Sequence, residues 1–122
     1  MNRYHLSNCF DTSNLDIATG ASLSASITCG GLRLSGIITP SSWTANTITF
    51  QASLDGTNFF NVYDAGGNEY TLNVSASRYI ILDIRAFYSI PFLKIRAGTS
   101  SSPSTQSVNQ TVSLLFGGDR GA

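Results

Sequence analysis

The chain has 122 residues, which is the length of one domain and enough to bury a core without disulfide cross-links. Charged residues make up only 11% of it, whereas about 25% is usual in a soluble domain. Seven basic residues balance seven acidic ones, so the formal net charge is zero. This neutrality argues against nonspecific binding to nucleic acid and against electrostatic binding to membranes, because both need a basic surface.

Hydroxyl side chains supply much of the polarity, with 18 Ser and 12 Thr. A weakly charged, neutral surface is poor at preventing association, so the composition favours a protein that functions covered by partners. We expect neither secretion nor a membrane span, because the start of the chain lacks a signal-peptide pattern and no apolar run reaches about 20 residues. Two reduced thiols at Cys9 and Cys29 are therefore expected, with a disulfide between them as the alternative.

Residues 1–20 scatter single apolar residues among Asn, Asp, Ser and Thr, and we interpret them as an irregular N-terminal arm. An irregular segment with this many apolar groups suits a strap that orders against the surface of a partner. The alternative is an arm that packs back on its own domain. The apolar residues of the predicted arm are Tyr4, Leu6, Phe10, Leu15 and Ile17.

From residue 21 onward the chain alternates apolar with polar residues over short runs, which is the period of half-buried strands. The clearest run is 47–54, which is followed by an Asp55-Gly56 hairpin signal with Gly56 at positive φ. A short helical turn is expected at 86–89, and 98–108 is expected to be a long exposed loop. The predicted strands are 22–28, 32–38, 47–54, 59–63, 69–74, 78–84, 92–97 and 110–116.

Short strands at a spacing of roughly 8–12 residues predict an all-β fold, an antiparallel β-sandwich (jelly roll) of about eight strands. The sandwich domain is expected to span 21–116, between the arm and a C-terminal tail at 117–122. The alternation along the best strands predicts the core residues Leu34, Ile48, Phe50, Ile80, Leu82, Leu93, Ile95, Val112 and Leu114, with Ala52 and Leu54 on the same strand face as Phe50.

Catalytic chemistry has little support in the sequence. The one histidine, His5, lies in the predicted arm, and none of the common nucleophile, phosphate-binding or zinc motifs is present. A Ca²⁺ site built on Asp64 or Glu69 is an alternative that lacks the usual spacing of acidic residues. We therefore expect no enzyme activity, no cofactor and no metal.

Aromatic residues are the remaining candidates for contact with a ligand or a partner. Trp43 follows Pro40 in a loop rich in Ser and Thr, and it is either a core residue or an exposed anchor. The predicted partner-binding set is Tyr4, Leu6, Phe10, Leu15, Ile17 and Trp43.

The segment from Trp43 to Tyr63, with Ser53-Leu54-Asp55-Gly56 at its centre, resembles the core hairpin of discoidin-like (coagulation factor C-type) jelly rolls. Arg78-Tyr79-Ile80-Ile81-Leu82 is similar to a further strand of those domains. The resemblance covers about residues 32–97 and implies the fold. The framing cysteines of those domains are missing, so their membrane or sugar binding is not implied.

A closer similarity is to small proteins encoded in the structural gene clusters of tailed phages and prophages. The shared pattern begins at Gly31-Leu32-x-Leu34-x-Gly36-Ile37, continues through Thr49-Phe50-Gln51-Ala52-Ser53-x-Asp55-Gly56, and ends at Leu93-Lys94-Ile95-Arg96-x-Gly98-Thr99. This resemblance implies a virion structural protein that is assembled in the host cytoplasm.

Within that class we expect a capsid decoration (cement) protein on the outer surface of the head. Its partners would be the major capsid protein or other virion proteins, with the chain forming a homo-oligomer on the particle. The alternatives are a neck or tail adaptor of the virion, and a carbohydrate-binding module used in host adsorption.

Overall fold

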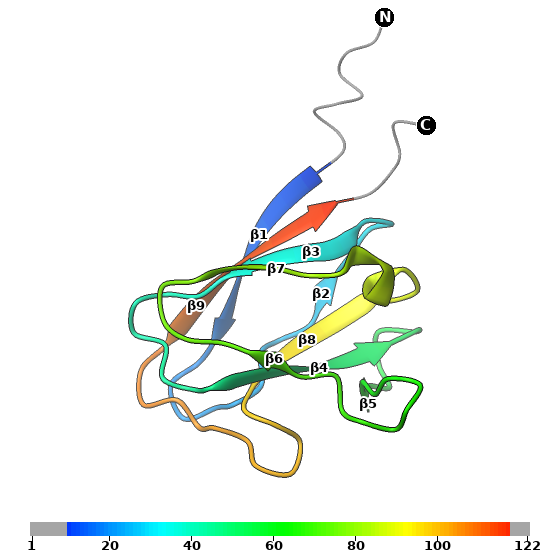
Figure 1. The fold of residues 1–122 in the computed structure, drawn as a ribbon. Helices are drawn as coiled ribbons and strands as arrows, with labels where there is room; N and C mark the ends of the chain where they lie inside the picture. The colour runs from blue at the N-terminus through cyan, green and yellow to red at the C-terminus, as the bar shows by residue number, and fades with distance from the viewer. Residues whose placement is uncertain (1–9, 118–122) are drawn as a thin grey trace, which may run out of the picture.

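A computed structural model describes residues 10–117 of the chain, and these residues form two antiparallel β-sheets (Figure 1). The first sheet has the strand order β1-β9-β3-β7, and the second has the order β2-β8-β4-β5, with β6 also paired to β4. The fold is therefore the predicted all-β antiparallel sandwich. The elements are β1 (Phe10–Ile17), β2 (Ile27–Thr28), β3 (Arg33–Ile38), β4 (Thr47–Ser53), β5 (Phe60–Asn61), β6 (Leu72–Asn73), β7 (Tyr79–Ile81), the 3₁₀ helix η1 (Ile84–Phe87), β8 (Phe92–Ala97) and β9 (Gln110–Gly117).

The core lies between the two sheets and follows from strand alternation. In β9, the side chains of Val112, Leu114 and Phe116 are buried, while Ser113 and Leu115 between them are half-buried. Of the predicted core residues, Ile80 is half-buried and packs against the core. The others are all buried: Leu34, Ile48, Phe50, Leu82, Leu93, Ile95, Val112 and Leu114.

The predicted arm is wrong for residues 10–17, because this segment is strand β1 of the first sheet. It pairs with β9 over its full length, from Phe10 opposite Gly117 to Ile17 opposite Gln110. Leu15 and Ile17 point to the core side, and Asp16 between them faces solvent. The low strand propensity of Asn, Asp and Ser is overridden by this pairing and by the burial of one face. The sandwich therefore begins at residue 10, not 21, and residues 1–9 lie outside the described residues.

Strand β4 leaves the sheet earlier than the alternation predicts. It ends at Ser53, and the chain then turns through a loop to Phe60, which pairs with Ala52. The predicted hairpin exists, but its connection is wider than the tight Asp55-Gly56 turn. Gly56 has the predicted positive φ, at 80°. Leu54 falls in the loop and is 84% exposed, so the prediction that it shares a strand face with Phe50 is wrong.

The remaining segments differ from the predictions in detail. The helical turn begins at Ile84 and ends at Phe87, two residues earlier than expected. Gln106 anchors the loop before β9 to the domain. Its backbone N–H donates a hydrogen bond to the Ala21 carbonyl, and its side chain is buried. Gly117 belongs to β9 and not to the predicted tail, of which residues 118–122 lie outside the described residues.

Candidate interaction surface

The predicted partner-binding residues do not form a common exposed surface. Ile17 is fully buried and Leu15 packs partly against the core. Phe10 begins β1, but the structure describes only its backbone. Tyr4 and Leu6 lie outside the described residues, so their role stays a prediction.

Trp43 is a core residue, and the exposed-anchor alternative is wrong. Its indole is only 4% exposed, and Nε1–H donates a hydrogen bond of 2.8 Å to the carbonyl oxygen of Ala45. An indole N–H needs such a partner when it is buried. Trp43 therefore closes the end of the sandwich where β3 leads into β4.

The loop carboxylates of Asp55 and Asp64 accept hydrogen bonds from backbone N–H groups of their own loops. Asp55 accepts hydrogen bonds from the backbone N–H groups of Asn58 and Thr57, each at 2.9 Å, and these bonds hold the pKa of its carboxyl far below the ordinary value. Asp64 accepts from the N–H groups of Gly66 and Asn68 in the same way. Over residues 10–117, no group of three or more His, Cys, Asp or Glu side chains is arranged to hold a metal ion.

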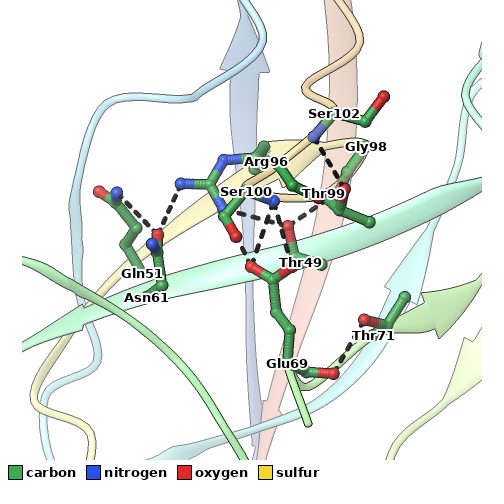
Figure 2. Close-up of polar contacts among 11 residues, drawn as sticks. Thr49, Gln51, Asn61, Glu69, Thr71, Arg96, Gly98, Thr99, Ser100 and Ser102 are labelled. Carbon is green, nitrogen blue, oxygen red and sulfur yellow. Dashed lines mark hydrogen bonds and ion pairs between the residues drawn. The ribbon is translucent and has the colours of Figure 1, made fainter.

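A polar cluster surrounds the guanidinium of Arg96 (Figure 2), on the face of the second sheet opposite the core residues Ile95 and Ala97. Arg96 Nη1 lies 3.3 Å from a carboxylate oxygen of Glu69, and Nη2 donates to Asn61 Oδ1 at 2.7 Å. Nη1 also donates to the hydroxyl of Thr49, which in turn donates to the carbonyl of Gly98. Strands β4, β5 and β8 are thereby tied to the loop that follows β8.

This cluster is satisfied internally and supports the fold. Glu69 uses its remaining acceptor capacity on the backbone N–H of Ser100. Its carboxylate is also neutralised by Arg96, which makes a Ca²⁺ site at Glu69 electrostatically unfavourable. Sequence reasoning missed the cluster. The available signal was an arginine inside the apolar strand Phe92–Ala97, where its charge needs a buried partner.

A different surface exposes large apolar side chains at one end of the domain. Leu54, Phe60 and Tyr88 are 84%, 70% and 52% exposed, and we call them the apical patch. Leu54 and Phe60 line one shallow hollow, and Leu54 and Tyr88 line the next, so Leu54 joins the two. The patch lies at the end of the sandwich where β4 ends and β8 begins, beside η1 (Figure 1).

One cation lies over a ring of the apical patch, and a second lies over the ring of Phe59, the residue before Phe60. The guanidinium of Arg33 lies over the Tyr88 ring at 4.0 Å from its centroid, and Lys94 Nζ lies over the Phe59 ring at 4.3 Å. Such contacts orient the rings and shield part of each from water. The patch thus combines large exposed apolar groups with a guanidinium that covers one of its rings.

No protein-family model matches this chain, and no curated protein is significantly similar to it. In residues 10–117, no helix is long and apolar enough to cross a membrane.

Proposed function

We propose that this chain is a structural protein of a phage virion, a decoration protein that binds the outer surface of the head through the apical patch. The observation that carries the proposal is the exposure of Leu54, Phe60 and Tyr88 together on a neutral, hydroxyl-rich domain. Large exposed apolar groups at one end of a small domain favour association with another protein.

The energetics suit a protein held on a lattice. Full burial of one such side chain contributes about 1.5–3 kcal/mol, so a patch of this size binds modestly on its own. Contacts between neighbouring copies on a particle would add to that affinity, because each linked contact raises the effective concentration for the next. A low net charge limits repulsion between crowded copies.

The resemblance of residues 31–99 to small proteins of tailed-phage structural gene clusters supports the choice of a virion over other partners. A neck or tail adaptor would expose a similar patch but would be present in far fewer copies. A carbohydrate-binding module would instead use exposed tyrosines such as Tyr63 or Tyr88 for stacking on sugar rings.

The test uses phage heads assembled from the genome that encodes this chain, after the gene for the chain has been deleted. We expect the purified protein to bind these heads to saturation in a cosedimentation assay. Leu54→Asp should abolish this binding, because it places a charge at the centre of the patch. Val108→Asp is the matched control, since Val108 is also exposed but precedes β9, at the opposite end of the sandwich.

Equal binding by both variants would contradict the assignment of the apical patch as the surface that docks on the head. Absence of any head binding by the wild-type protein, together with saturable binding to a glycan, would favour the carbohydrate alternative over the proposal.

A further inference from the structure

The backbone of β7 presents unused hydrogen-bonding groups along one edge of the first sheet. Strand β7 pairs only with β3 and ends the strand order of that sheet. The Arg78 carbonyl accepts from Thr39 N–H at 2.9 Å, and Leu82 N–H donates to the Ser35 carbonyl at 3.0 Å. Since residues that face β3 alternate with residues that face away, the N–H and C=O groups of Tyr79 and Ile81 point outward from the sheet edge.

The side chains of the same two residues are apolar and exposed. Tyr79 is 62% exposed and Ile81 is 84% exposed. Together with Leu115 of β9 they line a shallow hollow over Gly36 of β3. From Tyr79 to Leu82 the edge carries no charge.

The opposite edge of the sheet is protected in the usual way. Strand β1 carries the exposed acids Asp11 and Asp16, and a second copy of β1 paired antiparallel about its centre would bring Asp11 opposite Asp16. Like charges directly across a strand pair are unfavourable, and charged edge strands resist pairing with other chains. Strand β7 carries no charge between Tyr79 and Leu82, so its edge lacks this form of protection.

We propose that β7 pairs with β7 of a second copy of this chain, antiparallel and about a two-fold axis at Ile80. In this register Tyr79 lies opposite Ile81 of the second copy and Ile81 lies opposite Tyr79. Each of these pairs can exchange both of its N–H···O bonds, because both residues direct their backbone groups outward. An aromatic residue across from a β-branched residue is also a favourable cross-strand pair.

The charges at the two ends of β7 fit the antiparallel arrangement. Arg78 precedes the strand, and Asp83, which also pairs with Arg85 of its own chain, follows Leu82. Both Arg78 and Asp83 are exposed. An antiparallel pair brings Arg78 of one copy near Asp83 of the other at each end, whereas a parallel pair would place Arg78 beside Arg78. The edge is short, since Ser77 has a positive φ of 58° on one side and η1 begins at Ile84 on the other. A strand of equal length and complementary ends therefore matches it.

The test measures self-association of the isolated protein and is independent of head binding. We expect sedimentation equilibrium to show a concentration-dependent monomer–dimer equilibrium. Ile81→Lys should shift it to monomer, because a charge replaces the apolar cross-strand contact. Thr12→Lys is the matched control: Thr12 is exposed on β1 of the same sheet, and this variant should dimerise like the wild type.

Amide hydrogen exchange gives a second readout. The Tyr79 and Ile81 amides should become protected as the protein concentration rises, whereas the Ile80 amide, which faces β3, should be protected throughout. A protein that is monomeric at every concentration would overturn the proposal, as would a dimer that Ile81→Lys leaves intact. A monomer that loses head binding on Ile81→Lys would assign this edge to a different partner, and the second-copy proposal would be wrong.

Discussion

Phe50 lies at the centre of an aromatic cluster in the core. Its ring is fully buried, 5.3 Å from Phe87 edge-on and 6.0 Å from Tyr70 between ring centroids. We expect Phe50→Ala to lower the free energy of unfolding by about 3–5 kcal/mol, because it removes apolar burial and leaves a cavity. Denaturant melts measure this change. Leu54→Ala is the control and should leave the midpoint nearly unchanged, and a loss below about 1 kcal/mol for Phe50→Ala would contradict its place in the core.

The buried ion pair between Arg96 and Glu69 gives a second test at a single residue. Both side chains are largely buried, so Arg96→Met would leave an uncompensated carboxylate next to Thr49. Breaking such a pair costs about 3–5 kcal/mol of unfolding free energy, measurable in urea melts. Arg85→Met is the control, since the Arg85–Asp83 pair is exposed and should contribute nothing measurable. Equal effects of the two substitutions would show that the Arg96 cluster is not buried as described.

Cys29 is a free, buried thiol, and burial raises its pKa from 9.0 to about 11. Below pH 9 the thiol is protonated in both the folded and the unfolded chain. Between about pH 9 and 11 the unfolded chain loses this proton and the folded chain keeps it, so the contribution of Cys29 to stability falls as the pH rises.

In a Cys9→Ser background, we therefore expect the stability difference between Cys29 and Cys29→Ala proteins to shrink from pH 8.5 to pH 11. A thiol reagent at pH 8 should react with Cys29 only after denaturation. Rapid labelling of the native protein would show that the thiol is accessible.

At the scale of elements, β1 is part of the folded sheet and not an appendage. Removing residues 2–17 deletes Ile17 from the core and removes β1 from one side of β9 over eight paired residues, while β3 remains on the other side. We expect this truncation to abolish cooperative thermal unfolding, followed by circular dichroism. Removing only residues 2–9 is the control, because all of the described strands remain. A cooperative transition in both truncations would mean that β1 is dispensable for the fold.

Strands were predictable where apolar and polar residues alternate and where the strand is paired on both of its sides within the sheet. The segments 32–38, 92–97 and 110–116 match β3, β8 and β9 to within a residue. The segment 22–28 is less regular because a side chain enters its ladder, with the Ser24 hydroxyl accepting from the Ile95 N–H. A polar–apolar pattern does not show where a side-chain hydroxyl replaces a backbone carbonyl as the hydrogen-bond acceptor. Strand β1 escaped prediction because its pairing with β9, nearly 100 residues away, outweighs its local propensity.

The apical patch is a property of the whole molecule and could not be predicted from the sequence. Alternation placed Leu54 on the same face as Phe50, but the chain leaves the sheet after Ser53, where the Ser53 hydroxyl accepts from the Gly56 N–H. Leu54, Phe60 and Tyr88 come from separate loops and strands, and only the sheet topology brings them to one end. The low charge that suggested a covered protein was visible in the composition, whereas the location of the covered surface was not.

As a decoration protein, this chain would be an abundant component of a phage head. Quantitative mass spectrometry of purified virions from the encoding phage genome, with the major capsid protein as the internal standard, tests it most directly. A decoration protein on a symmetric head should be present in hundreds of copies per particle, whereas a neck or tail adaptor forms one ring of about a dozen. We predict a copy number of the same order as that of the major capsid protein. A ring-sized number would contradict the decoration assignment, and absence of the chain from purified virions would contradict a structural role altogether.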